Sequence, residues 1–140
     1  RADTFKTSGH GLRFGSLDCS SCHNVHDGNN DFQLVRETVN DTCFECHADK
    51  RGPFLWEHAP ATEDCSLCHD VHGSNHPAAL SKRPPLLCQQ CHSAVGHPSL
   101  ALTSEDTDNN RSRFLLSRGC MNCHSQVHGS NHPSGSTQLR

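Results

Sequence analysis

Apolar positions are few and scattered along this chain of 140 residues. No run of them approaches the roughly 20 consecutive apolar residues that a membrane-spanning helix needs. The pattern predicts short helices joined by loops, and it contains no convincing pair of strands. We therefore expect a single domain over residues 1–140 that is mostly irregular, with short α-helices.

Local signals place two of these short helices. Asn-Asp-Thr at 40–42 and Glu-Asp at 63–64 are plausible N-caps, because their side chains can accept hydrogen bonds from the first free amides of a helix. The helices that they would start cover residues 43–47 and 65–69.

The composition does not supply a large side-chain core. Apolar residues make up 32% of the chain, ten of them are cysteines, and aromatic residues amount to only 5%. Such a chain would be disordered, or would depend on covalent or metal cross-links, if it bound no cofactor. The formal charge is −3. The sequence has no basic stripe, so nothing in it points to nucleic-acid binding.

All ten cysteines fall in five copies of the motif C-x-x-C-H, and none is left over. This motif is an attachment site for c-type haem. Its two sulfurs can form thioethers with the two vinyl groups of one porphyrin, and the adjacent histidine binds the iron as proximal ligand. The predicted attachment residues are Cys19, Cys22, Cys43, Cys46, Cys65, Cys68, Cys88, Cys91, Cys120 and Cys123, and the predicted proximal ligands are His23, His47, His69, His92 and His124.

Five haems would change the argument about the core. Each would be enclosed by only 28 residues (140/5), so the porphyrin faces would form the interior. We expect the chain without haem not to fold. Porphyrins wrapped this thinly cannot be insulated from one another, and electrons should tunnel along the whole row. The predicted fold class is therefore a multihaem c-type cytochrome wrapped around a chain of five haems.

The motifs are spaced as an internal repeat. They start at residues 19, 43, 65, 88 and 120. The repeat is best described as a two-haem unit, in which an upstream histidine precedes C-x-x-C-H-x-x-H and a second C-x-x-C-H closes the unit. This unit is used twice and then begun a third time.

The remaining eight of the thirteen histidines are candidates for the sixth iron ligand. The single methionine, Met121, lies inside a motif, where its geometry is poor for that role. We therefore expect two histidines on every iron, which gives a low-spin state and a lower potential than a histidine and a methionine. The candidates by position in the repeat are His10, His26, His58, His72 and His97, followed by His128.

Six candidates exceed the five sites that need them. The surplus His128 is expected either to contact a propionate or to bind a haem of a neighbouring molecule or a further repeat. His76 and His132 are weaker candidates, because each lies in a Gly-Ser-Asn-His-Pro segment, at 73–77 and 129–133. These two segments are predicted to form the same turn.

Other uses of the cysteines fit less well. Tetrahedral zinc sites take Cys-x-x-Cys pairs but do not require a histidine after every pair. A disulfide framework gives no reason for five identical spacings, and a thioredoxin-like dithiol needs a βαβ context that is absent. A multihaem reductase for nitrite or a sulfur oxyanion stays open as an alternative. It would need one haem with a free distal site, and distal candidates are in excess.

Four segments, at 51–58, 65–77, 87–92 and 120–133, resemble the decahaem cytochromes of bacterial metal-reduction and extracellular dimethyl-sulfoxide-respiration pathways. The chain also resembles the pentahaem electron donor of the ammonia-forming nitrite reductase. The resemblance implies haems with two histidine ligands in a continuous chain. The decahaem proteins sit inside an outer-membrane porin and carry electrons from the periplasm to the cell surface, whereas this sequence has half their number of haem motifs.

The expected function is electron transfer in respiration, without enzymatic activity. A quinol-oxidising cytochrome is the expected donor, and an outer-membrane cytochrome or terminal reductase is the expected acceptor. Insertion into a porin or self-assembly, including a polymeric haem filament, remains possible. Covalent haem attachment normally takes place outside the cytoplasm. We therefore expect an exported bacterial protein of the periplasm, outer membrane or cell surface, with no transmembrane segment of its own.

Overall fold

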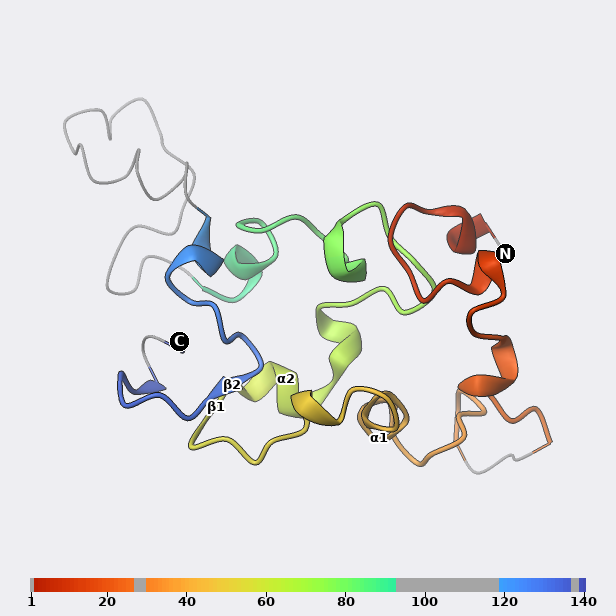
Figure 1. Cartoon of the computed structure of the whole chain (residues 1–140), viewed down its shortest axis with the longest axis horizontal. Helices are drawn as coiled ribbons and strands as arrows, with labels where there is room; N and C mark the ends of the chain where they lie inside the picture. Colours follow the sequence, from red (N-terminus) through yellow and green to blue (C-terminus); the bar gives the residue numbers. More distant parts are fainter. Residues whose placement is uncertain (1, 27–29, 93–118, 137–138) are drawn as a thin grey trace.

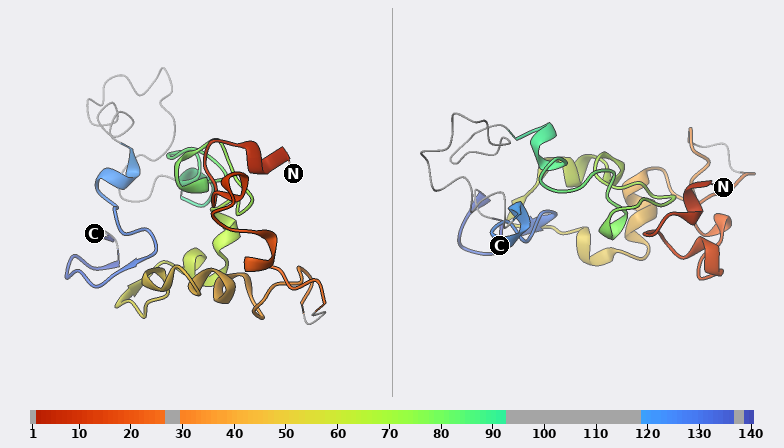
Figure 2. Two further views of the ribbon diagram at one scale, coloured as in Figure 1. Left: turned by 45° about the vertical axis from the view of Figure 1, so that its right-hand side comes forward. Right: turned by 90° about the horizontal axis from the view of Figure 1, so that it is seen from above.

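The computed structural model describes residues 2–26, 30–92, 119–136 and 139–140. The chain is extended, with its N-terminal turns at one end and the strand pair toward the other (Figures 1 and 2). Two short α-helices, α1 (Val39–Phe44) and α2 (Ala59–Glu63), lie among single turns of 3₁₀ helix and irregular segments. The 3₁₀ turns are η1 (Ala2–Phe5), η2 (Leu12–Phe14), η3 (Cys19–Ser21), η4 (Ala48–Lys50), η5 (Cys65–Leu67), η6 (Pro77–Ala79), η7 (Cys88–Gln90) and η9 (Cys120–Asn122).

The two predicted helix starts have different outcomes. Asp64 caps η5 as expected, because its carboxylate accepts a hydrogen bond from the amide of Ser66 at 2.7 Å. The cap predicted at 40–42 is wrong by two residues. Thr38 is the N-cap of α1, and its hydroxyl oxygen accepts from the amide of Asp41 at 3.0 Å, so residues 40–42 lie inside the helix.

A short strand pair was not predicted. Strand β1 (Trp56–Glu57) pairs antiparallel with β2 (Gly129–Ser130), so that Trp56 lies opposite Ser130. The indole Nε1–H of Trp56 also donates to the carbonyl of His132 at 3.1 Å. Strands of two residues are too short to carry an alternating pattern, and the sequence therefore gives no sign of this pairing.

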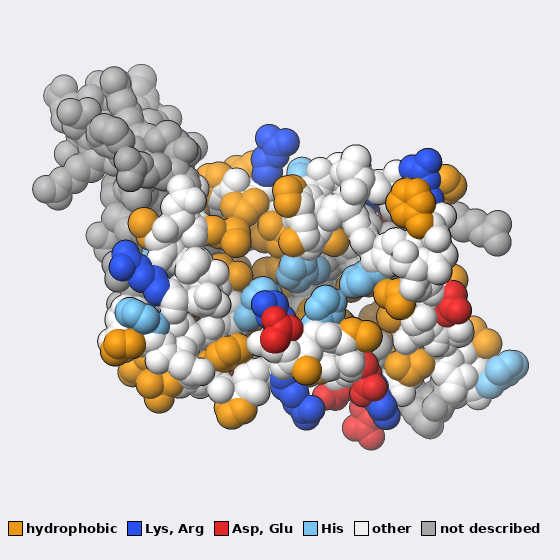
Figure 3. Space-filling model, in the orientation of Figure 1, with side chains coloured by type: hydrophobic (Ala, Val, Ile, Leu, Met, Phe, Trp, Pro, Cys, Tyr) orange, Lys and Arg blue, Asp and Glu red, His pale blue; other side chains and the backbone are white. Residues whose placement is uncertain are grey.

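The described residues contain almost no side-chain core. Ala79 is the buried apolar residue among them, and Phe5, Phe14 and Phe32 are between 65% and 80% exposed. Histidine side chains gather in the hollowed middle of one face (Figure 3). A protein that leaves large aromatic side chains uncovered lacks the apolar partners that stabilise an ordinary domain.

One buried polar side chain links α1 to α2 and to the start of the third motif. Asn40 is 8% exposed. Its amide nitrogen donates to the carbonyls of Ala61 and Thr62 at 3.2 and 3.1 Å, and its oxygen accepts from the amide of Cys65 at 2.8 Å. This residue therefore holds the helix of the second motif against the start of the third.

Candidate haem-binding sites

The five C-x-x-C-H motifs share one backbone conformation. In every motif the histidine amide donates to the carbonyl of the first cysteine at 2.9–3.0 Å. Four motifs form the turns η3, η5, η7 and η9, and the second begins in the last turn of α1. The common hydrogen bond closes a single helical turn, which brings both cysteines and the histidine onto a short arc of backbone. This arrangement suits attachment to one edge of a porphyrin and ligation of its iron.

All ten cysteines lie in the described part of the chain, where they are free thiols. Each motif has a cysteine close enough to interact electrostatically with a cysteine of the next motif. These contacts join Cys22 to Cys43, Cys43 to Cys65, Cys68 to Cys91, and Cys88 to Cys120. The attachment points of successive motifs are therefore neighbours in the order of the sequence.

Partial burial protects several of these thiols from ionisation. Burial raises the pKa of the Cys43 thiol to about 12, with the neighbouring Cys65 thiol as the next cause. Burial likewise raises the pKa of Cys88 to about 11, and it raises the pKa of Cys68. The thiolate is the species that attacks disulfides, so these protonated thiols are slow to exchange while they are adjacent to one another.

Four pairs of imidazole rings lie at nearly the same separation. The ring centres are 6.0–6.2 Å apart in the pairs His10–His47, His23–His72, His58–His92 and His69–His128. A first-row metal binds an imidazole nitrogen at about 2 Å, and that nitrogen lies about 1.1 Å from the ring centre. Two rings on opposite sides of one iron therefore have centres about 6.2 Å apart. The pairs fit the axial ligands of haem.

Hydrogen bonds fix the orientation of a ring in every pair. The Nδ1 atoms of His23 and His69 lie 2.9 and 2.8 Å from the carbonyls of Phe32 and Ala78. A donating Nδ1–H leaves Nε2 as the nitrogen that is free to bind a metal. His10 and His58 make equivalent contacts to backbone carbonyls, which complete the same arrangement in the other two pairs.

Burial affects the charge of one further ring. His128 has its pKa lowered mainly by burial, and the nearby Lys50 ammonium adds to this effect. A lowered pKa keeps the imidazole neutral, which is the form that ligates metals.

The histidines ranked from the sequence differ in where they lie. His10, His58 and His72 each face a motif histidine, and so does His128, which had been ranked behind the other candidates. His26 is exposed, and no imidazole of the described residues is found beside it. His97 lies outside the described residues.

The pairing crosses motifs in a way that the sequence did not indicate. His72 follows the third motif but faces the histidine of the first, and His128 follows the fifth but faces the histidine of the third. His10 and His58 precede the first and third motifs and face the histidines of the second and fourth. The histidines after a motif thus reach back two motifs, and those before a motif reach past it to the next one, a regularity that only the fold makes visible.

Other metal chemistry has little support in the described ranges. Within them, no group of three histidine, cysteine, aspartate or glutamate side chains is close enough to hold a metal ion by itself. A zinc site built from the cysteine pairs would need such a group. A pair of facing imidazoles supplies only two ligands. Such a pair instead suits a metal that is already held by a cofactor such as a porphyrin.

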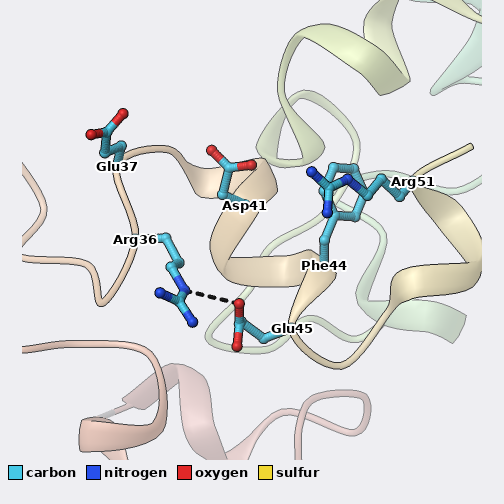
Figure 4. A pocket seen from close by; sticks show the side chains of 6 residues that line it. All are labelled: Arg36, Glu37, Asp41, Phe44, Glu45 and Arg51. Atoms are coloured by element: carbon cyan, nitrogen blue, oxygen red, sulfur yellow. Dashed lines mark hydrogen bonds and ion pairs between the residues drawn. The ribbon is translucent and has the colours of Figure 1, made fainter. Parts of the chain in front are cut away.

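An open depression lies beside the second motif (Figure 4). Its lining side chains are Arg36, Glu37, Asp41, Phe44, Glu45 and Arg51. Arg36 donates to the Glu45 carboxylate at 2.8 Å, and this contact lowers the pKa of Glu45. Glu45 is therefore ionised at neutral pH, which makes it a poor general acid.

No helix in the described part of the chain is long and apolar enough to cross a membrane.

Comparison with known proteins gives two matches. Residues 12–52 and 58–97 match the family model for the doubled CXXCH motif. Each segment contains two of the C-x-x-C-H motifs, so the motifs are paired as the predicted repeat has them. The chain is also 54% identical over 138 residues to multiheme cytochrome MtrA of Shewanella baltica, which covers 96% of this chain. It spans only 41% of that relative's length.

These matches bear on one of the two resemblances. The likeness to the multihaem conduit cytochromes is confirmed, and the likeness to the nitrite reductase donor stays a prediction. The motifs, the free thiols beside them and the paired imidazoles agree with this assignment. The chain belongs to the doubled CXXCH motif family and is a multihaem c-type cytochrome.

Proposed function

We propose that this chain binds five haem c groups, each with two histidine ligands, and passes electrons along them. The four imidazole pairs at 6.0–6.2 Å carry the proposal, because that separation fits two axial ligands on one iron. Haem supplies a metal that changes between two oxidation states, and the chain supplies the ligands, their orientation and the surroundings that set the potential. Ligation on both sides keeps the rearrangement on each transfer small.

The neighbouring thiols support transfer in sequence order. Cys43 contacts Cys65, and Cys88 contacts Cys120, so the attachment points of motifs two and three, and of motifs four and five, nearly touch. Groups bound to adjacent thiols are held close together. The proposed path runs from the first motif to the fifth, or in reverse.

For the fifth motif, His97 is the proposed distal ligand, as expected from its position upstream. His124, the motif histidine, is half-exposed and makes a contact of its own within the structure. The intact-mass and EPR measurements described at the end of this section test this site together with the other four.

The proposed setting is the outer region of a bacterial cell. The similar protein of Shewanella baltica is a multiheme cytochrome. We infer that this chain is exported and accepts electrons from a quinol-oxidising cytochrome. It delivers them to an outer-membrane cytochrome or a terminal reductase, with a porin as a structural partner.

His26 favours a second candidate, in which the chain assembles with another haem-binding unit. His72 follows its motif histidine by three residues, as His26 does, and His128 follows its own by four. His72 and His128 each face the histidine of a motif two places earlier. His26 is exposed and is therefore available to a haem carried by another unit or another molecule. Size-exclusion chromatography of the holoprotein and of His26→Ala tests this, since loss of assembly in the variant supports it and an unchanged monomer contradicts it.

Two measurements on the oxidised holoprotein test the main proposal. Intact mass gives the number of attached haems, and low-temperature EPR with near-infrared magnetic circular dichroism counts irons with two histidine ligands. Five low-spin haems of this type support electron transfer. A high-spin haem that binds carbon monoxide or nitrite at neutral pH would instead favour the reductase.

A further inference from the structure

Two distant pairs of segments are joined in the same way. In the first, residues 7–10 lie against 71–75, and the amides of Ser8 and Ser74 each donate to the other's carbonyl at 2.9 and 2.8 Å. In the second, residues 55–58 lie against 127–131, and Trp56 pairs with Ser130. We call these contacts the first and second clip. Each joins a segment before one haem motif to the segment after a motif two places later.

An asparagine closes both clips at the same place. The side-chain oxygen of Asn75 accepts from the amide of Thr7 at 3.3 Å, and that of Asn131 accepts from the amide of Leu55 at 2.7 Å. Each asparagine therefore extends its backbone ladder by one hydrogen bond and fixes which residues lie opposite each other.

The serine of each clip holds the turn behind it. Ser74 and Ser130 are both 3% exposed. Their hydroxyl oxygens accept from the amides of His76 and His132 at 2.9 and 3.0 Å. The Gly-Ser-Asn-His-Pro turn is thus the same structure used twice, as the sequence predicted.

At the other end of each clip, two proposed distal ligands meet. The Nδ1 of His10 lies 3.1 Å from the carbonyl of Val71, and the Nδ1 of His58 lies 2.8 Å from the carbonyl of Val127. Each valine directly precedes another proposed distal ligand, His72 or His128. A displacement of either strand therefore disturbs two ligands that belong to two different haems.

We propose that Asn75 and Asn131 are positioning residues, each of which sets the distal ligands of two haems through its clip. This proposal rests on the function inferred above. Asn75 would act on the haems of motifs one and two, and Asn131 on those of motifs three and four. Each asparagine thereby affects the reduction potentials of two haems together.

The direction of the effect follows from the imidazole hydrogen bond. An Nδ1–H that donates to a carbonyl makes the ring a stronger base and a stronger iron ligand. A stronger ligand stabilises the ferric state and lowers the potential. Loosening a clip weakens this hydrogen bond, so both haems of the pair become easier to reduce.

The angle between the two imidazole planes of a pair allows the effects of the two clips to be told apart. The planes of His10 and His47 are 60° apart, whereas those of the other three pairs lie within 8–19°. The angle between two axial imidazole planes controls the spread of the EPR g-values of a low-spin haem. The haem of the second motif should therefore give a separate signal, and the first clip contains one of its ligands.

The experiment compares holoproteins of the wild type, Asn131→Ala, Asn75→Ala and Asn131→Asp. Asn75 and Asn131 are exposed, so the alanine variants leave no cavity. Aspartate keeps the accepting oxygen and should restore wild-type behaviour. Intact mass establishes full haem loading, EPR reports the ligand geometry, and a redox titration followed by haem absorbance gives the potentials.

In Asn131→Ala we expect two reduction steps to move together to higher potential while the EPR signal of the 60° pair stays unchanged. In Asn75→Ala that signal should change. A change in one haem only, no change, or a change of the 60° signal in Asn131→Ala would overturn the proposal. If Asn131→Ala does not bind a full set of haems, the result for Asn75→Ala tests the proposal instead. High-spin haem in the wild type would instead refute the proposed ligation itself.

Discussion

Replacing Asn40 tests the link between the second and third haem motifs. The Asn40 side chain is 8% exposed and makes three hydrogen bonds, two donated and one accepted. A hydrogen bond contributes about 1 kcal/mol net to stability, so Asn40→Ala should lower the free energy of unfolding by about 3 kcal/mol. The accepted bond comes from the amide of Cys65, and its loss frees the start of the third motif.

The assay is guanidinium unfolding of the holoprotein, followed in parallel by far-ultraviolet circular dichroism and haem absorbance. We expect the midpoint to fall while the slope stays unchanged, which identifies a loss of stability rather than a change in the unfolded chain. The EPR spectrum of the folded variant should broaden for the haems of motifs two and three.

Asn24→Ala is the matched control. Asn24 is exposed, and its side chain accepts a single hydrogen bond, from the amide of His26 at 3.2 Å. An exposed substitution of this kind changes stability by less than about 0.5 kcal/mol. An Asn40→Ala variant that is no less stable than Asn24→Ala would refute the idea that this side chain holds the two motifs together.

Three further predictions use unfolding midpoints of the holoprotein. Thr38→Ala should cost about 1 kcal/mol, because it removes the N-cap of α1, and serine at this position should restore it. Gly129→Ala should cost at least about 2 kcal/mol, because φ is +144° and a Cβ would collide with a phenyl ring. Gly15→Ala, where the surrounding space is open, should cost less. The lowered pKa of Glu45 gives stability that is fully present above the unfolded pKa of about 4.3 and is lost as the pH falls from there through the lowered folded pKa, and Arg36→Gln should remove this acid dependence. Equal midpoints for alanine and serine at position 38, or for Gly129→Ala and Gly15→Ala, would contradict the respective explanation. The same acid dependence in the wild type and in Arg36→Gln would contradict the explanation for Glu45.

Much of the candidate site could be predicted because haem attachment is a local event. The cysteines and the motif histidine lie within five consecutive residues, and the cap at Asp64 acts over two residues. The scarcity of buried apolar side chains among the described residues also follows from the low apolar content. Each of these properties is decided by neighbours in the sequence.

The remainder depends on contacts between distant residues. The partner of His23 is His72, and no local pattern states which motif a free histidine will face. Position in the repeat placed His26 ahead of His128, the sixth candidate for five sites, yet of these two only His128 lies against a motif histidine in the described ranges. The β1–β2 pair escaped notice for the same reason, since two residues carry no periodicity.

The proposed crossing of ligands between repeats would also set an order of biogenesis. The imidazole that faces His23 comes from a later repeat, after the third motif. In a chain that is synthesised and exported from its N-terminus, the first haem can be attached by its own motif long before its second ligand arrives. Under the proposed ligation, its iron would have a single protein ligand during that interval. The haem of the third motif would likewise wait for His128, whereas the haems of motifs two and four would find His10 and His58 already exported. Maturation would then alternate between haems that are completed at once and haems that wait for a later repeat.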